Sequence, residues 1–310
     1  MKSRPSSPSA HPAVLPDAVV PRLDKQIQIA LQRALDVRFH GRRPSGGTLP
    51  LVLHFHGGTF NGGSLDSGAG VAQLLAQAGA VVMSVDYPLA PAHPFPQAVD
   101  TGYAALQWAW KVRHKLAGPG APMVVAGEEA GGNLAAAIAL MARDRQEVPL
   151  SGQILLSPML DACVATASLR EACAQARAAE CVWANGWRQY LPSAADAGHP
   201  YAAPGTVRRL TGLPPALLVT AQDDPLRDET LAYAARLRAA GLAVQQAVLA
   251  APTGWPGRYA DAQRIKGGSP AWAGELRQQF RTFFAAMAAT PEQAAPAFSS
   301  ASSSVPSSIS

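Results

Sequence analysis

A short run of small residues around a pair of carboxylates is the first feature of this sequence that could do chemistry. The run Gly-Glu-Glu-Ala-Gly at 127–131 follows an apolar stretch and leads into a helical pattern. Glycines at both ends allow a sharp strand-to-helix turn, in which larger side chains would collide. The run therefore has the frame of a nucleophile elbow, Gly-x-Ser-x-Gly, with Glu129 in the position of the serine.

A second run of small residues, His-Phe-His-Gly-Gly-Thr-Phe at 54–60, follows another apolar stretch. Its small side chains leave backbone N–H groups free to donate hydrogen bonds to an oxygen on which negative charge develops. We predict that such an oxyanion hole is formed by the N–H groups of Gly57, Gly58, Thr59 and Ala130. The side chain of Thr59 would narrow this hole.

The elements that must position these two runs are short apolar segments that alternate with helical patterns. Such short, continuously apolar segments are typical of buried parallel strands, which we predict at 51–56, 81–86, 123–127, 153–156, 216–221 and 244–249. Helices are predicted at 70–77, 96–112, 133–143, 227–239 and 272–288, and two antiparallel edge strands within 26–39. This order favours the α/β class, with a mostly parallel twisted sheet flanked by helices.

The domain is predicted to extend over residues 22–289, with one long insertion. The segment 161–210 is too long for a simple connection and carries a helical pattern around 168–179, so we expect an inserted helical cap over the carboxyl edge of the sheet. The segments 1–21 and 290–310 are rich in Ala, Ser and Pro. They contain too little apolar surface to offset chain entropy, and we expect both to be disordered tails.

The composition excludes several classes of protein. The chain of 310 residues is 48% hydrophobic and 15% charged, which is typical of a globular domain with a large core and not of a disordered chain. The net charge of +5 is spread along the sequence, so no nucleic-acid partner is expected. No stretch approaches the about 18 consecutive apolar residues of a membrane span. We therefore expect a soluble, cytoplasmic protein without a membrane partner.

Three cysteines, Cys163, Cys173 and Cys181, lie at irregular spacing within the predicted cap. An odd number without a Cys-x-x-Cys pair indicates neither a disulfide framework nor a metal site. We interpret them as small buried hydrophobic residues and expect a reducing compartment. No metal and no cofactor are expected, because the glycine-rich stretches also lack the phosphate-binding Gly-x-x-x-x-Gly-Lys-Ser/Thr loop.

Four further passages, in order along the chain, carry a resemblance to a known family. They read Val-Asp-Tyr-Pro-Leu-Ala-Pro at 85–91, Ala-His-Pro-Phe-Pro at 92–96, Gly-Leu-Pro-Pro-Ala-Leu-Leu-Val-Thr-Ala at 212–221 and Asp-Pro-Leu-Arg-Asp-Glu at 224–229. With the two glycine runs, they make the chain from Leu35 to Ala288 resemble the hormone-sensitive-lipase and bacterial acetyl-esterase branch of the α/β-hydrolases.

The resemblance implies a site with only one conventional member of a Ser-His-Asp triad. Asp224 matches the family's acid, Glu129 stands in the place of the nucleophile, and Thr253 stands where the family has its histidine. A serine hydrolase needs a hydroxyl as nucleophile and an imidazole that takes and returns its proton. Both of these groups are replaced here.

Two other residues could take over parts of the triad. His199, at the exit of the predicted cap, is the last of seven histidines and the one that could replace the imidazole, although a surface histidine is the more ordinary interpretation. Asp223 neighbours Asp224 and could share its role. We also expect His56 and Trp255 to lie beside the pocket, since Trp255 follows the position of the lost histidine.

Three hypotheses for Glu129 stay open in the sequence. In the first, its carboxylate occupies the oxyanion hole, and the N–H groups of Ala130, Gly58 and Thr59 lower its pKa and keep it charged. In the second, it is a nucleophile, like the aspartate of dehalogenase-like and epoxide-hydrolase-like relatives, which use a histidine to activate water. In the third, it is a general base for elimination, hydration or isomerisation, which needs a carboxylate with a raised pKa.

Because two of three triad positions are replaced, we expect a catalytically altered or inactive esterase-like hydrolase. It would bind a small acyl or ester-like ligand, or a protein partner, in the old pocket. Plant hormone receptors of the same branch, which lost the histidine, are a precedent by resemblance. The alternatives are an active enzyme, either a weak carboxylic-ester hydrolase or a Glu129-dependent hydratase, lyase or isomerase, and a scaffold with a closed pocket. The resemblance also allows a homodimer.

Overall fold

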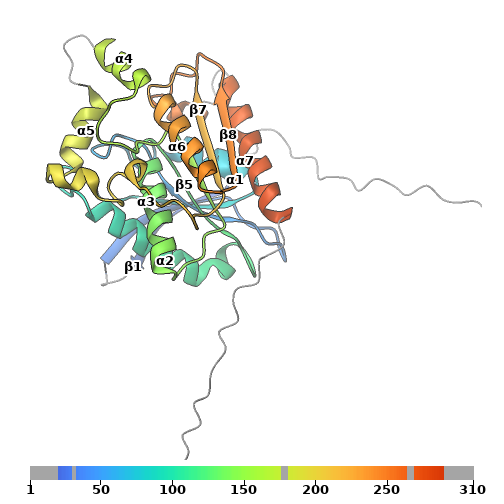
Figure 1. Cartoon of the computed structure of the whole chain (residues 1–310). Helices are drawn as coiled ribbons and strands as arrows, with labels where there is room; N and C mark the ends of the chain where they lie inside the picture. Colours follow the sequence, from blue (N-terminus) through green and yellow to red (C-terminus); the bar gives the residue numbers. More distant parts are fainter. Residues whose placement is uncertain (1–19, 30–32, 176–180, 264–268, 290–310) are drawn as a thin grey trace, which may run out of the picture.

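The computed structural model describes residues 20–29, 33–175, 181–263 and 269–289, and within them eight strands form one sheet (Figure 1). Its order is β1-β2-β4-β3-β5-β6-β7-β8. The strands are β1 (Arg22–Ile29), β2 (Arg33–His40), β3 (Leu51–Phe55), β4 (Val81–Val85), β5 (Met123–Glu128), β6 (Gly152–Leu156), β7 (Ala216–Ala221) and β8 (Val244–Leu249). The pairs β1–β2 and β2–β4 are antiparallel, and the other neighbours are parallel. The predicted α/β class with a mostly parallel sheet is confirmed.

Helices connect the strands and cover the sheet (Figure 1). They are α1 (Ala69–Gln77), α2 (Gln97–Leu116), α3 (Ala130–Arg145), α4 (Ala167–Gln175), α5 (Val182–Tyr190), α6 (Arg227–Ala239) and α7 (Ala271–Ala289). The predicted helices at 96–112 and 133–143 are each longer in the structure. The helix after β5 begins three residues earlier than predicted, because the glycine pair at 131–132 belongs to its first turn.

Two apolar cores lie on the two faces of the sheet. The central strands alternate between them, so that Leu53 belongs to one core and the adjacent Val52 to the other. This alternation follows from the strand geometry, in which successive side chains point to opposite faces. The first core contains buried residues of α2, α3 and α6, and the second contains those of α1 and α7. Strands β3, β4, β5 and β6 are buried along their whole length, which explains their continuous apolar sequences.

Between β6 and β7 the chain forms α4, α5 and two short 3-10 helices at 194–198 and 204–206. Two carboxylates of α6 hold the beginning of this segment. Asp228 accepts a hydrogen bond of 2.9 Å from the N–H of Ser168, and buried Glu229 accepts one of 2.5 Å from the N–H of Leu160. Burial raises the pKa of Glu229 to about 8. The helix predicted around 168–179 is present as α4 up to Gln175, and residues 176–180 lie outside the described part.

The prediction for the cysteines was wrong. Cys173 and Cys181 form a disulfide, with their Cα atoms 5.0 Å apart, and Cys163 is exposed and unpaired. The physical reason is that the end of α4 lies beside the beginning of α5. This brings Cys173 and Cys181 within the distance that a disulfide spans. None of the three is a fully buried apolar residue. The cysteines therefore give no indication of a reducing compartment.

The predicted tails fall almost entirely outside the described residues, since the described chain begins at Val20 and ends at Ala289. Among the helices that the structure does describe, we find none with the length and apolar character that crossing a membrane would require.

We predict that Gly131→Ala destabilises the fold strongly. A Cβ atom at this position would lie 2.0 Å from the backbone oxygen of Phe55 and 2.4 Å from that of His56, so α3 and β3 would have to separate. We expect the free energy of unfolding to fall by about 3 kcal/mol or more, measured by urea denaturation.

Gly274→Ala is the matched control, because a Cβ atom at this exposed position of α7 meets no atom within 4 Å. It should raise the free energy of unfolding by about 0.5–1 kcal/mol through helix propensity. Equal effects of the two substitutions would contradict the close packing of α3 on β3.

Candidate functional site

Glu129 lies at the turn between β5 and α3, in a backbone conformation that L-residues seldom adopt. Its φ is 54° and its ψ is −115°. Such conformations persist only where neighbouring contacts hold them, and they concentrate at functional sites. Here the N–H of Glu129 donates to the carbonyl of Leu156, and its carbonyl accepts from the N–H groups of Asn133 and Met159. The sequence therefore forms the predicted elbow, with a carboxylate at its apex.

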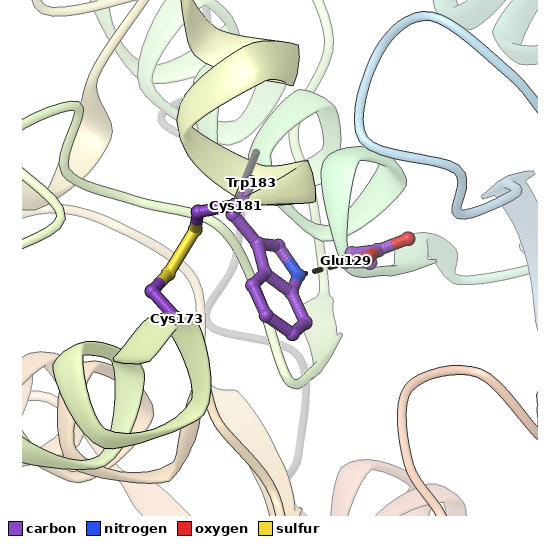
Figure 2. Close-up of a disulfide and its surroundings, with 4 residues drawn as sticks. All are labelled: Glu129, Cys173, Cys181 and Trp183. Atoms are coloured by element: carbon purple, nitrogen blue, oxygen red, sulfur yellow. Dashed lines mark hydrogen bonds between the residues drawn. A yellow bond between two sulfur atoms is a disulfide. The ribbon is translucent and has the colours of Figure 1, made fainter. Parts of the chain in front are cut away.

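The side chain of Glu129 is closed in from two sides. Its Oε2 accepts hydrogen bonds of 2.6 Å from the N–H of Gly58 and 3.3 Å from the N–H of Thr59. Its Oε1 accepts a hydrogen bond of 3.1 Å from Nε1 of Trp183, which lies in the first turn of α5 (Figure 2). The side chain of a residue larger than glycine at Gly57 would meet Oε2 at 3.1 Å. The carboxylate thus occupies the place that the sequence predicts for an oxyanion.

Two details of the predicted contacts differ from the structure. Among the described residues, the N–H of Ala130 is not a donor to the Glu129 side chain; its third donor is the indole of Trp183. The second detail is the direction of the pKa shift, which the donors alone do not decide. Burial raises the pKa of Glu129, and the hydrogen bonds from Gly58, Thr59 and Trp183 offset only part of that effect.

The loop that supplies these N–H groups is held by buried hydrogen bonds of His54 and Glu128. His54 Nε2 lies 2.8 Å from Glu128 Oε2, and its Nδ1 lies 2.9 Å from Ser84 Oγ. The other oxygen of Glu128 accepts the N–H of Gly57 at 3.3 Å. Glu128 therefore fixes the position of the N–H next to those that hold Glu129.

His56 supports the same loop from within. Its Nδ1 donates to the carbonyl of Gly57 at 2.8 Å, its ring stacks on Tyr87 at 4.3 Å, and the Tyr87 hydroxyl donates to its carbonyl at 2.7 Å. Only 2% of His56 is exposed, and burial lowers its pKa, which favours the neutral ring. Its contacts are those of a residue that positions the loop.

Asp224 is a buried carboxylate whose partners are hydroxyl groups. Its Oδ2 accepts hydrogen bonds from Ser157 Oγ and, at 2.5 Å, from Thr220 Oγ1, and its Oδ1 accepts the N–H of Leu226 at 2.9 Å. The hydroxyl of Tyr259 donates to Ser157 Oγ at 2.7 Å. A chain of hydroxyls from Tyr259 through Ser157 thus leads to this carboxylate.

Thr253 pairs with Asp223 and not with Asp224. The Asp223 carboxylate accepts the hydroxyl of Thr253 at 2.8 Å, its N–H at 2.7 Å and the N–H of Gly254 at 2.9 Å. Asp223, which the sequence suggested as a substitute acid, therefore anchors the loop after β8. The three predicted triad positions are not linked by hydrogen bonds in the described structure: Glu129, Asp224 and Thr253 each have separate partners.

The expectation for Trp255 is not met, whereas His199 has the contacts of the ordinary interpretation. Trp255 is 2% exposed and lies in the core beneath α7, with its ring 4.6 Å from Tyr259 and 5.3 Å from Trp272, so it packs in the core and not along the pocket. His199 lies 5.0 Å from the ring of Phe95, and its Nδ1 accepts the N–H of Tyr201. These contacts are those of an exposed surface histidine.

Three residues of the site were missed from the sequence. Ser157 directly follows β6, at the same edge of the sheet as Glu129 and Asp224, so the rule that carboxyl ends of parallel strands gather could have found it. Trp183 and Tyr259 lie in the cap and in the loop after β8, where no motif marks them. In the described part of the chain, no group of three His, Cys, Asp or Glu side chains could hold a metal ion.

Comparisons with known proteins agree with this geometry. Residues 52–251 match a family model described as the alpha/beta hydrolase fold. The chain is 39% identical over 202 residues to Carboxylesterase NlhH of Mycobacterium tuberculosis; the match covers 64% of this chain and 63% of that protein, which is just under two thirds of the relative's length.

A solved structure and a receptor are also similar. The structure of EstE1, a thermostable carboxylesterase cloned from a metagenomic library, superposes with a TM-score of 0.75 at 31% identity, covering 88% of this chain and 92% of that one. The gibberellin receptor GID1A of Arabidopsis thaliana is 33% identical over 213 residues, covering 64% of this chain and 60% of the receptor.

We predict that the carboxyl of Glu129 titrates above its ordinary pKa of 4.5, because burial disfavours the charged form. The folded state then binds this proton more tightly than the unfolded state, so the contribution of Glu129 to stability falls as pH rises from 4.5 through the raised pKa. Side-chain carboxyl ¹³C NMR over this pH range gives the midpoint, with Glu129→Gln to assign the signal.

Urea denaturation supplies the second measurement of the same effect. The free energy of unfolding of wild type should fall relative to that of Glu129→Gln as pH rises through this window. A midpoint at or below 4.5, with a stability difference that does not change with pH, would contradict the burial of an incompletely compensated carboxyl.

Proposed function

Since the chain belongs to the alpha/beta hydrolase fold family, in the branch of carboxylesterases, we propose that it is a catalytically altered member that binds a small acyl or ester-like ligand at the former catalytic pocket. The observation that carries the proposal is the pair of hydrogen bonds from Gly58 and Thr59 to Glu129. The donors that would stabilise the oxyanion of an ester are already used by the protein itself.

The loss of serine chemistry follows from the remaining contacts. The apex of the elbow has no hydroxyl, and the hydroxyl of Ser157 donates to Asp224 with no imidazole between them. A hydroxyl without a base to take its proton is a weak nucleophile. In serine proteases, removal of single triad members costs several orders of magnitude in rate.

A binding role fits both the site and the relatives. Trp183 reaches Glu129 from the cap, so the site has a cover contributed by α5 that a ligand would displace. One relative is named as a receptor and not as an esterase, which supports binding as a use of this fold. A protein partner in the same place and a permanently closed scaffold are the competing outcomes.

One observation favours a second candidate function. Burial raises the pKa of Glu129, and a carboxyl with a raised pKa is suited to general acid–base catalysis near neutral pH. Such an enzyme would perform elimination, hydration or isomerisation, and Glu129→Gln would abolish its activity.

We expect wild type to turn over short p-nitrophenyl esters at a rate at least about 10⁴-fold below that of Carboxylesterase NlhH, assayed side by side. Glu129→Gln should leave this trace rate within about threefold, since the carboxylate does not attack the ester. Robust ester turnover by wild type that is abolished in Glu129→Gln would contradict the proposal and support catalysis by the carboxylate.

The same esters should nevertheless bind. In saturation-transfer NMR with p-nitrophenyl butyrate, run with and without dithiothreitol, magnetisation should reach the acyl protons of the intact ester under at least one condition. If no ester with a short or medium acyl chain binds under either condition, the ligand proposal is wrong and the closed scaffold is favoured.

A further inference from the structure

The disulfide of the cap lies next to the residue that covers Glu129. Cys181 is the residue before α5 begins, and Trp183 is the second residue of that helix. Figure 2 shows the disulfide, the indole and the Glu129 carboxylate in one line, with Trp183 between the other two. The disulfide at Cys181 is therefore two residues from Trp183, whose hydrogen bond to Glu129 covers the site.

The two halves of α5 are held in different ways. Its carboxyl-terminal half is packed in the core: Tyr190 is 1% exposed and stacks on Phe60 at 3.9 Å, and the carbonyl of Tyr190 accepts the N–H of Phe95 at 2.8 Å. The first turn is less buried, with Val182 54% exposed and the next three residues partly buried. Trp183 packs against the core from this turn, and the disulfide and the hydrogen bond from Trp183 to Glu129 add to that contact.

The other end of the tie is firmly attached to the domain. Cys173 belongs to α4, whose second residue, Ser168, is fixed at two points: its N–H donates to Asp228 of α6, and its hydroxyl donates to the carbonyl of Pro225, just before α6, at 2.7 Å. The disulfide thus connects the first turn of α5 to an anchored helix. Both cysteines are partly exposed, so a small thiol can reach the bond.

We propose that the Cys173–Cys181 disulfide is a redox latch on the ligand site: its reduction frees the first turn of α5 and withdraws Trp183 from Glu129. This inference rests on the proposed function, because it takes Glu129 to mark the ligand site. In the reducing step a dithiol attacks the S–S bond and becomes a cyclic disulfide. The dithiol gives up two electrons and two hydrogens, and these convert Cys173 and Cys181 into thiols. Oxidation by a disulfide reverses the step.

The consequence for the site is a change in access. With the latch closed, both oxygens of Glu129 are hydrogen-bonded, Oε2 to the loop and Oε1 to the cap. With the latch open, Oε1 loses its indole partner, and the space that Trp183 fills becomes available to a ligand. The anchored half of α5 stays in place, so the opening is a local movement and not an unfolding of the cap.

The test follows the indole N–H of Trp183, whose hydrogen exchange reports directly on its hydrogen bond. We expect reduction with dithiothreitol to speed this exchange by about tenfold or more, measured by ¹H–¹⁵N NMR with Trp183→Phe to assign the signal. The Cys173→Ser/Cys181→Ser double variant should exchange fast under both conditions. Cys163→Ser, the matched control at the unpaired cysteine, should behave like wild type.

Two outcomes would overturn the latch. One is unchanged indole exchange after reduction, with the two new thiols verified by alkylation and mass spectrometry. The other is the presence of free thiols at Cys173 and Cys181 after treatment with a disulfide oxidant. Neither measurement uses an ester, so robust ester hydrolysis would refute the proposed function while leaving these results readable.

Discussion

The structure of the site depends on one interaction, the burial of the Glu129 carboxylate against the N–H groups of Gly58 and Thr59. Leaving these donors unpaired in a buried site would cost about 1–3 kcal/mol each. Glu129 satisfies them itself, and burial raises its pKa because the donors only partly replace the lost water. The same geometry that would bind an oxyanion of a substrate therefore holds a side chain of the protein.

The other carboxylates around Glu129 also have hydrogen-bond donors of their own. Asp224 accepts hydrogen bonds from the hydroxyl groups of Ser157 and Thr220, and Asp223 anchors the loop after β8 through Thr253. Glu129, Asp223 and Asp224 thus each have their own set of donors, as buried polar groups such as Glu129 and Asp224 require.

Much of the scaffold could be predicted from the sequence because local patterns dictate it. The strands at 216–221 and 244–249 and the helix at 227–239 have the predicted bounds, since apolar runs and helical periodicity report burial directly. The position of Glu129 in a sharp turn also followed from its flanking glycines: the missing side chain of Gly127 leaves room for the backbone of α3, and that of Gly131 leaves room for the end of β3.

The features of the site that could not be predicted from the sequence depend on contacts between distant segments. Trp183 meets Glu129 across 54 positions of sequence, and Tyr259 meets Ser157 across 102, so no local pattern marks either pair. The disulfide was missed because counting cysteines says nothing about where helix ends meet. The direction of the pKa shift of Glu129 could not be predicted either, because it depends on how burial and the hydrogen-bond donors compare in the folded protein.

The most direct test of the central claim is amide hydrogen exchange at Gly58 in wild type and in Glu129→Ala. The amide of Gly62, which donates to the carbonyl of Gly58 at 2.9 Å and does not contact Glu129, is an internal control. The account predicts that the Gly58 amide is protected in wild type and exchanges faster by about tenfold or more in the variant, while Gly62 is unchanged. Equal exchange of Gly58 in the two proteins would show that Glu129 does not occupy the oxyanion hole.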